Sequence, residues 1–348
     1  MKIAQIAPLC ESVPPRLYGG TERVVASLCD ELVTAGHDVT LFASGDSWTR
    51  ARLVAMRDRA IRLDPAPLKS EVAAHLAMMH EVHARAREFD VLHFHLDLLH
   101  FPFFEQIAQR TLTTLHGRLD LADLPLAYRR WPQYPLVAIS QSQRSQLPDA
   151  SWLATVHHGI PVERYRFSPR HEGTLAFVGR FSPEKRADRA VEIARRAGRD
   201  LVAAAKVDPA DERYFRQQIA PLLQAPHVRC VGEVGDAEKN DILGAAAALL
   251  FPIDWPEPFG LVMTEAMACG TPVVAWDRGS VREVVEHGVT GFVVRSIDEA
   301  VEAVQRIDTI DRRRVRETFE RRFSAATMAR NYLQLYARLA RRQPALSA

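Results

Sequence analysis

The stretch WPEPFGLVMTEAMACGTPVVA, residues 255–275, decides the fold of the second half of this chain. A turn containing Gly260 leads into a helix-forming segment, and the stretch closes on an apolar run that is typical of a buried strand. The first N–H groups of a helix have no partner within it, so the backbone of residues 260–262 is predicted to bind a phosphate. Glu257 precedes this turn and Glu265 lies inside the helix.

Strand-like and helix-like runs alternate along the whole chain, which is typical of parallel sheets with crossover helices. In the first half, strands are expected at 3–8, 38–43, 91–94, 113–115 and 135–139, with helices near 21–36, 70–88 and 102–109. In the second half, strands are expected at 173–178, 200–205, 228–231, 247–251 and 272–275, with helices near 184–197, 209–223, 236–245 and 260–269. The sequence therefore predicts the α/β class.

The length of 348 residues predicts about two domains. The alternation restarts after residues 157–170, where glycine and prolines interrupt regular structure. We therefore expect two Rossmann-like domains, over residues 1–163 and 171–323. The segment 324–342 has apolar residues at helical spacing and is expected to pack back on the first domain as an amphipathic helix.

Composition excludes several classes of protein. A net charge of +2 gives no electrostatic footprint for nucleic acid. The four cysteines are widely spaced, which indicates reduced thiols rather than a disulfide or zinc scaffold. The start MKIAQIAPL is typical of a strand and not of a signal peptide, and no uninterrupted apolar run reaches the length of a membrane span. A cytoplasmic protein is expected.

The motif from Glu257 to Ala275 resembles the signature of the family 4 retaining glycosyltransferases, which have the GT-B fold of two Rossmann-like domains facing each other across a cleft. The resemblance implies transfer of a hexosyl unit from a nucleotide-sugar to an acceptor hydroxyl. The acceptor attacks the face from which the leaving group departs, and neither a metal nor a cofactor is needed. UDP is the expected nucleotide and glucose the expected sugar.

The resemblance also assigns roles around this motif. It implies that Glu257 contacts the transferred sugar and that Glu265 accepts hydrogen bonds from the ribose. The backbone that binds sugar and phosphate is that of Phe259, Gly260, Leu261 and Val262.

Two cations follow a strand in FVGRFSPEK, residues 177–185. Arg180 and Lys185 suit a diphosphate, because fixed positive charge stabilises the charge that grows on the leaving group. The resemblance extends through this motif with one departure, since the family often has glycine where this chain has Arg186.

The segment VGEVGDAEKNDILGAA, residues 231–246, resembles the part of the family that lines the nucleotide base. Backbone groups around Val234 are expected to do so here. Glu233 and Lys239 are expected to be solvated and are given no chemistry.

The first half contains RLYGGTERVVASL, residues 16–28, which lacks the full dinucleotide fingerprint. By resemblance, Gly19 and Gly20 approach the donor phosphates and the acceptor. His116 lies at a strand end, where ligands bind in open α/β sheets. The resemblance implies that it contacts the donor sugar and takes part in catalysis with Arg180, Lys185 and Glu257.

Several histidines lie near a second strand end. His93, His95 and His100, with Asp97 among them, could be interpreted as a metal site. We prefer acceptor binding by His95 and Asp97 and expect no metal. The pair His157 and His158 is given no role.

Three other functions stay open: a nucleotide-sugar epimerase of the same fold, a sugar-nucleotide sensor without catalysis, and a dinucleotide-dependent oxidoreductase. The acceptor, whether small molecule or glycan, cannot be identified from these residues. The balanced charge of the first half argues against a membrane acceptor, although Arg129, Arg130 and Trp131 form one small basic and aromatic group.

Overall fold

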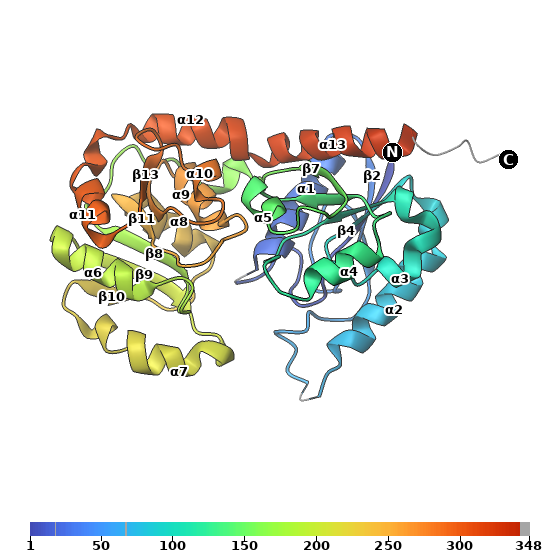
Figure 1. The fold of residues 1–348 in the computed structure, drawn as a ribbon, viewed down its shortest axis with the longest axis horizontal. Coiled ribbons are helices and arrows are strands. Elements are labelled where there is room, and N and C mark those ends of the chain that lie inside the picture. The colour runs from blue at the N-terminus through green and yellow to red at the C-terminus, as the bar shows by residue number, and fades with distance from the viewer. Residues whose placement is uncertain (18, 67, 342–348) are drawn as a thin grey trace. The chain divides into compact units, whose positions relative to one another are not determined.

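The computed structural model describes residues 1–17, 19–66 and 68–341. The chain divides into two compact units (Figure 1). Unit 1 contains Met1–Gly159 and the C-terminal segment from Ala325, and unit 2 contains Ile160–Ser324. The chain therefore enters unit 2 after Gly159 and returns to unit 1 after Ser324.

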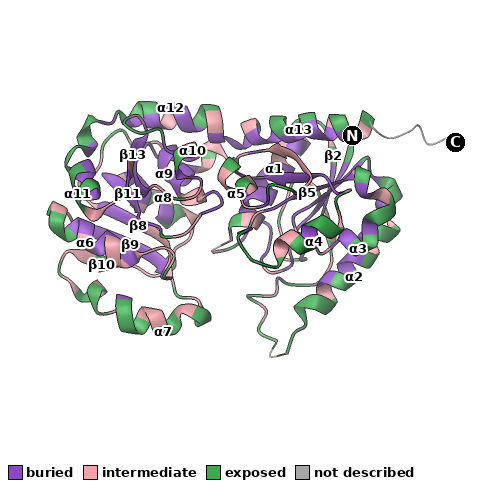
Figure 2. Ribbon diagram, in the orientation of Figure 1, coloured by how far each residue is buried: buried purple, intermediate pink, exposed green. Residues whose placement is uncertain are grey.

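Unit 1 is built on a parallel sheet, which has seven strands within the described residues, in the order β3-β2-β1-β4-β5-β6-β7. Five of these strands are buried along nearly their whole length (Figure 2). Burial on both faces is typical of parallel sheets that are covered by helices. The strands are β1 (Lys2–Ile6), β2 (Asp38–Ala43), β3 (Arg52–Ala55), β4 (Val91–Phe94), β5 (Thr111–Thr114), β6 (Leu136–Ala138) and β7 (Trp152–Thr155).

Helices connect these strands and enclose a core rich in phenylalanine, including Phe42, Phe94, Phe101 and Phe104. The α-helices before the chain leaves unit 1 are α1 (Gly20–Thr34), α2 (Glu71–Ala84), α3 (Phe101–Phe104), α4 (Leu124–Arg130) and α5 (Gln141–Ser145). Short 3₁₀ turns follow α2 at Ala86–Glu88 and α3 at Glu105–Arg110.

The C-terminal helix α13 (Ala325–Arg341) belongs to unit 1 and packs on α1. Its buried stripe follows the spacing expected from the sequence and includes Met328, Tyr332, Leu335, Tyr336 and Leu339. Residue 342, the last of the predicted helix, lies outside the described residues.

Unit 2 is built on a second parallel sheet, which has six strands within the described residues, in the order β10-β9-β8-β11-β12-β13. Its strands are β8 (Leu175–Arg180), β9 (Leu201–Lys206), β10 (Val228–Cys230), β11 (Ala248–Phe251), β12 (Val273–Trp276) and β13 (Gly291–Val294). Its α-helices are α6 (Ala187–Ala197), α7 (Glu212–Tyr214), α8 (Asp236–Ala245), α9 (Leu261–Ala268), α10 (Val281–Val284), α11 (Ile297–Gln305) and α12 (Arg312–Phe323).

The strand order of each sheet reverses beside its first strand, at β1/β4 in unit 1 and at β8/β11 in unit 2. Loops that leave the carboxyl ends of such neighbouring strands open a crevice, and ligands of doubly wound sheets bind there. Most predicted site motifs follow β1 and β4 in unit 1 and β8 and β11 in unit 2, whereas His116 follows β5 and Val234 follows β10. This topology confirms the predicted α/β class with two Rossmann-like units.

All ten predicted strands are present, and three short strands, β3, β7 and β13, were not predicted. The helix predicted over 209–223 is wrong as a continuous element. Pro209 and Pro221 bound a series of short α, π and 3₁₀ turns instead, since proline favours the start of a helix and disrupts its interior. In the part of the chain that the structure describes, no helix has both the length and the apolar character needed to cross a bilayer.

Candidate functional site

The loop after β8 places Lys185 close to Glu257. Lys185 Nζ forms an ion pair with Glu257 Oε2. Only 11% of each side chain is exposed. The same ammonium lies 5.5 Å from the ring centroid of Phe251 and 5.3 Å from that of Trp255. A carboxylate and two aromatic faces therefore hold this cation in a fixed position.

Glu257 is held by its own loop, which follows β11. The indole Nε1–H of Trp255 donates to Glu257 Oε2 over 2.8 Å. The main chain is also fixed, since Ser280 N–H donates to Glu257 O over 3.0 Å and Ser280 Oγ donates to Phe259 O over 2.8 Å. Gly279 has φ +54°, and a side chain there would collide with the backbone of Glu257.

The loops after β8 and β11 are joined directly. Asp254 N–H donates to Glu184 O over 2.8 Å. The Asp254 carboxylate receives Arg186 Nη1 at 3.0 Å and Arg189 Nη2 at 2.9 Å. These contacts fix the two loops that carry Lys185 and Glu257 relative to each other.

The chain has Arg186 where the family often has glycine, and its backbone and contacts show how arginine is accommodated there. Arg186 is the N-cap of α6 and has a left-handed backbone, φ +54° and ψ +53°. Glycine adopts this conformation without strain, whereas other residues do so at a cost. The Arg186 guanidinium forms a forked contact with Asp188 (2.7 to 3.2 Å) as well as the bond to Asp254, which offsets that cost.

Helix α9 begins immediately after Gly260, as the motif predicted. Gly260 has φ +76°, and a Cβ there would lie 2.8 Å from Met263 Cε, so both conformation and space require glycine. Leu261 and Val262 form the first turn and are partly exposed. Their N–H groups have no acceptor within the helix and lie at the positive end of its dipole. This end of the helix therefore suits an anion.

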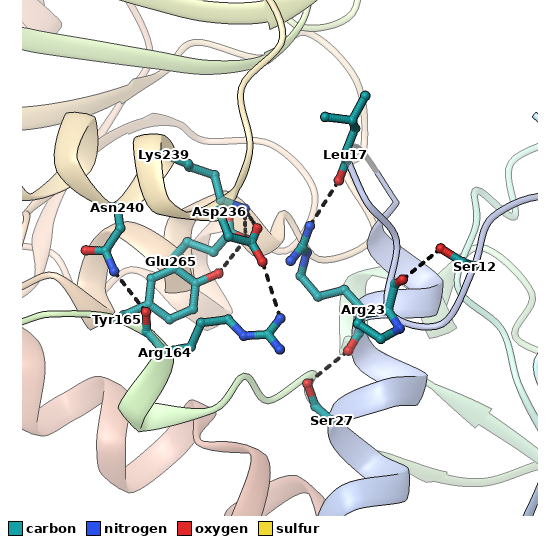
Figure 3. A network of polar contacts seen from close by, with 11 residues as sticks. Ser12, Leu17, Arg23, Ser27, Arg164, Tyr165, Asp236, Lys239, Asn240 and Glu265 are labelled. Atoms are coloured by element: carbon teal, nitrogen blue, oxygen red, sulfur yellow. Dashed lines mark hydrogen bonds and ion pairs between the residues drawn. The ribbon is translucent and has the colours of Figure 1, made fainter. Parts of the chain in front are cut away.

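Glu265, one turn further along α9, is buried and pairs with Lys239 (Figure 3). Its Oε1 receives Lys239 Nζ at 2.5 Å and the Tyr165 hydroxyl at 2.8 Å. The exposed fractions of the Lys239 and Glu265 side chains are 11% and 6%. The prediction that Lys239 is solvated is therefore wrong, because its stem lies on the buried face of α8, one turn before Leu243. Glu233 is exposed, as expected.

Arg180 ends β8 and is directed toward acidic residues after β9. Its Nη1 lies 3.0 Å from Asp208 Oδ2, and its guanidinium is within 4 Å of Glu184 and Asp211. Lys206, its register partner on β9, also binds Asp208, at 2.8 Å. Arg180 thus belongs to an ion-pair cluster on the β9 side of the loop, while Lys185 belongs to the β11 side.

Val234 lies in the loop between β10 and α8 and is partly exposed. Gly232 with φ +78° turns the chain before it, and Gly235 is the N-cap of α8. The loop therefore leaves the carboxyl end of β10, at the same edge of the sheet as the loops after β8 and β11.

In unit 1, the Gly-Gly turn forms the start of α1. Gly19 is the N-cap and Gly20 the first helical residue. A Cβ at Gly19 would lie 2.7 Å from Pro15 Cβ, so this close approach requires glycine. The turn is supported by Arg23, whose Nη2 donates to Leu17 O over 3.1 Å (Figure 3).

His116 is one member of a hydrogen-bonded chain of histidines in unit 1. His95 Nδ1 lies 2.8 Å from His116 Nε2, and His95 Nε2 lies 2.8 Å from Gln5 Oε1. On its other side, His116 Nδ1 lies 3.3 Å from His158 Nε2, and the two rings stack. The structure thus brings together the predicted residues His95 and His116 and adds Gln5 and His158, which the sequence analysis did not select.

These imidazoles are neutral. Burial lowers the pKa of His95 and of His158 well below 6.5, and the neighbouring rings lower both further. Burial lowers the pKa of His116 to about 3. A row of neutral rings can donate and accept hydrogen bonds without introducing charge.

The other residues of the histidine-rich segment are arranged differently. His93 binds Tyr336 and Thr114, and the ring of His100 stacks on Phe94. Asp97 is exposed and has a left-handed backbone with φ +48°. Among the described residues, no group of three or more His, Cys, Asp or Glu is placed to hold a metal ion.

Two features of the site had weak signals in the sequence. Gln5 is a lone polar residue in an apolar strand, KIAQI, which indicates a buried partner. Lys239 stands four residues before Leu243 on one face of a helix. Their partners, His95 and Glu265, are 90 and 26 residues away in sequence, so spacing alone could not identify them.

Comparison with known proteins agrees with this fold. The sequence profile "Glycosyltransferase Family 4" matches residues 18–211, and "Glycosyl transferases group 1" matches residues 163–322. The fold and the matched profiles define a GT-B glycosyltransferase. The chain belongs to glycosyltransferase family 4.

Individual relatives cover nearly the whole chain. A phosphatidyl-myo-inositol mannosyltransferase of Mycobacterium leprae is 29% identical over 97% of this chain and 96% of its own length. A glycogen synthase of Mycobacterium tuberculosis is 27% identical over 95% of this chain and 94% of its own. The crystal structure of AviGT4, a glycosyltransferase involved in avilamycin A biosynthesis, is 25% identical, covers 98% of both chains and superposes with a TM-score of 0.72.

Proposed function

We propose that this glycosyltransferase moves a hexosyl unit from a nucleotide-sugar to an acceptor hydroxyl with retention of configuration. The observation that carries the proposal is the Lys185–Glu257 pair at the β8/β11 switch point, in which Glu257 lies on the loop that leads into the N-terminus of α9. A fixed cation and free helical N–H groups suit a diphosphate, and a carboxylate suits sugar hydroxyls.

Each donor-site residue has a distinct role in this proposal. Lys185 and Arg180 neutralise the diphosphate and stabilise its growing charge as the glycosidic bond breaks. Arg180 would exchange part of its contact with Asp208 for phosphate oxygens. Glu257 orients the sugar, and Glu265, fixed by Lys239 and Tyr165, accepts hydrogen bonds from the ribose.

The acceptor hydroxyl attacks the anomeric carbon from the face that the nucleotide leaves, which retains configuration without a covalent intermediate on the protein. A retaining glycosidase would instead need two carboxyl groups about 5 Å apart, one of them a nucleophile. We propose that the step needs no metal ion. Chelation with EDTA should therefore leave turnover unchanged.

UDP-glucose is our proposed donor, from the general resemblance to members of the family that use it. The mannosyltransferase relative makes GDP- or UDP-linked mannose the main competitor. On the acceptor side, we propose that Gly19, Gly20, His95 and Asp97 of unit 1 contribute, with His116 contacting the donor sugar. The relatives differ in product, so we propose no acceptor from them.

A donor screen tests the proposal before the acceptor is known. Purified protein is mixed with UDP-, GDP- and ADP-sugars, and both the melting temperature and slow sugar release are measured. Binding to the folded state raises the melting temperature by mass action, so one nucleotide should give a clear shift and slow hydrolysis. Conversion of the donor to its epimer would instead indicate an epimerase, and no response to any nucleotide-sugar would overturn the proposal.

A further inference from the structure

Two hydrogen-bonded arms in unit 1 meet at the side chain of Gln5. We call the first the histidine arm, which runs from Gln5 Oε1 through His95 and His116 to His158. The other, the tyrosine arm, runs from Gln5 Nε2 to Tyr336. One amide therefore contacts both arms, with its acceptor facing one and its donor facing the other.

The amide fixes the direction of the histidine arm. Gln5 Oε1 can only accept, so His95 Nε2 must carry the proton. A neutral imidazole has one N–H, which makes His95 Nδ1 an acceptor and requires His116 Nε2 to donate to it over 2.8 Å. By the same rule His116 Nδ1 is an acceptor, which faces His158 Nε2 at 3.3 Å.

The same amide also sets the direction of the tyrosine arm. Gln5 Nε2 donates to the Tyr336 hydroxyl over 3.0 Å, so Tyr336 donates its own proton to His93 Nδ1 over 2.7 Å. His93 must then carry its proton on Nε2, which lies 2.8 Å from Thr114 Oγ1. Gln5 and His93 are register partners on β1 and β4, which explains why one residue serves both arms.

We propose that Gln5 is a positioning residue that acts through His95 to hold His116 as the Nε2–H tautomer. His116 Nδ1 is then an acceptor, and a sugar hydroxyl can donate to it in place of the 3.3 Å contact to His158. The inference rests on the proposed function, which places His116 against the donor sugar. The 3.3 Å contact to His158 is the longer of the two contacts that His116 makes, and His116 is the least buried ring of the arm.

Neutrality supports this assignment. A protonated ring would donate from both nitrogens, so the hydrogen bonds of the arm would no longer all run in one direction. Burial lowers the pKa of His95 and His158 well below 6.5 and that of His116 to about 3. The titratable groups in these contacts are the histidines themselves, so each ring of the arm should keep one tautomer across the neutral pH range.

Nitrogen-15 NMR of the full chain tests the tautomer directly. Two-bond proton–nitrogen spectra of the imidazole rings distinguish protonated from unprotonated nitrogen. We expect His95, His116 and His93 to show a protonated Nε2 and an unprotonated Nδ1, unchanged from about pH 6 to 8. A protonated Nδ1 in His95 or His116, or averaged signals from the two nitrogens of either ring, would overturn the inference. The wild-type protein is sufficient for this test.

Two variants test the consequence for sugar transfer. Gln5→Met removes the acceptor that fixes His95, and Tyr336→Phe is the matched control that breaks only the tyrosine arm. In Gln5→Met we expect averaged His116 nitrogens and kcat/KM about five- to tenfold lower, the loss of one neutral hydrogen bond to substrate. Tyr336→Phe should keep the His116 tautomer and wild-type kcat/KM.

The outcomes separate this inference from the proposed function. Lower activity in Gln5→Met with an unchanged His116 tautomer would show a merely structural effect and overturn the positioning role. A wild-type protein with the expected tautomer that releases sugar from no nucleotide-sugar would overturn the proposed function, while the tautomer assignment would stand.

Discussion

The strand-end sites of the two units bury different kinds of polar group. Unit 1 buries a row of neutral rings, in which His95, His116 and His158 are linked to the amide of Gln5. Unit 2 instead buries charge, as the pairs Lys185–Glu257 and Lys239–Glu265. Neutral donors and acceptors suit hydroxyl groups, whereas fixed charges suit a diphosphate and its leaving-group charge.

The comparison shows that the same doubly wound scaffold presents two kinds of polar group at its strand ends. Lys185 and Glu257 follow the two strands at the switch point of unit 2, whereas His95, His116 and His158 follow β4, β5 and β7 of unit 1. Of the four predictions below, the first compares the two units directly and the other three disturb unit 2.

The largest expected effect is a loss of stability of unit 1 in mild acid. The pKa of His93, His95, His100, His116 and His158 is lowered in the folded state, chiefly by burial, while an unfolded histidine titrates near 6.5. Below pH 6.5 the unfolded chain thus binds more protons than the folded one. Each of these histidines should cost about 1.4 kcal/mol of stability per pH unit, which is about 2 kcal/mol each by pH 5 and about 10 kcal/mol for the five. Burial raises the pKa of Glu22 to about 7, and desolvation raises the pKa of Asp97 to about 6, so these two carboxyl groups offset part of the loss.

Unit 2 should respond only at lower pH. Burial alone would raise the pKa of Asp208, but hydrogen bonds from Lys206 and Arg180 lower it overall, below 3.8. Its stabilising effect is present above pH 3.8 and is lost as pH falls through the lowered value. Hydrogen exchange followed by peptide mass spectrometry, corrected for intrinsic rate, reports each unit separately. Equal loss of protection in both units at pH 5.5 would contradict the comparison.

The next effect is on catalysis. Lys185→Ala should lower turnover at least about a hundredfold, because one preorganised charge contributes roughly 3–4 kcal/mol to transition-state stabilisation. Arg282→Ala, which removes an exposed cation paired with Asp277, is the matched control and should keep wild-type turnover. Steady-state sugar release with saturating donor is the measurement. Wild-type turnover in a folded Lys185→Ala protein would remove Lys185 from the mechanism.

A third prediction concerns the buried pair that holds Glu265. Lys239→Ala leaves a buried carboxylate without its cation, which should lower the free energy of unfolding by about 3 kcal/mol. Arg295→Ala breaks an exposed pair with Asp277 and should cost less than about 0.5 kcal/mol. Urea denaturation measures both. A cost for Lys239→Ala as small as that for Arg295→Ala would mean that Lys239 is effectively solvated.

The smallest effect isolates backbone strain. Arg186→Gly and Arg186→Ala both lose the contacts to Asp188 and Asp254, and they differ in their tolerance of φ +54°. The glycine variant should therefore be about 1 kcal/mol more stable than the alanine variant. Thermal denaturation compares them. Equal stability, or a more stable alanine variant, would show that Arg186 is not strained.

Local signals predicted most of the fold and the turn that begins α9. This turn at Gly260 is specified by consecutive residues, and buried strands such as β11 are continuous apolar runs. Short strands with weaker patterns, such as β3 and β7, are only partly buried and were not predicted.

Partnerships between distant residues could not be predicted. The sequence shows Lys239 as one charge among several on α8, and only the fold places Glu265 beside it. His158 lies beside His116 because the strands that precede them, β7 and β5, end at the same edge of a parallel sheet. Such contacts depend on strand order, which the spacing of residues along the chain does not specify.

The central claim is that the site around Lys185 and Glu257 transfers sugar with retention. The most direct measurement is proton NMR of the sugar first released from UDP-glucose, recorded before the anomers equilibrate. We predict that α-glucose, which has the donor's configuration, appears first, and that Lys185→Ala nearly abolishes its release. Release of β-glucose first, or undiminished release by Lys185→Ala, would contradict the claim.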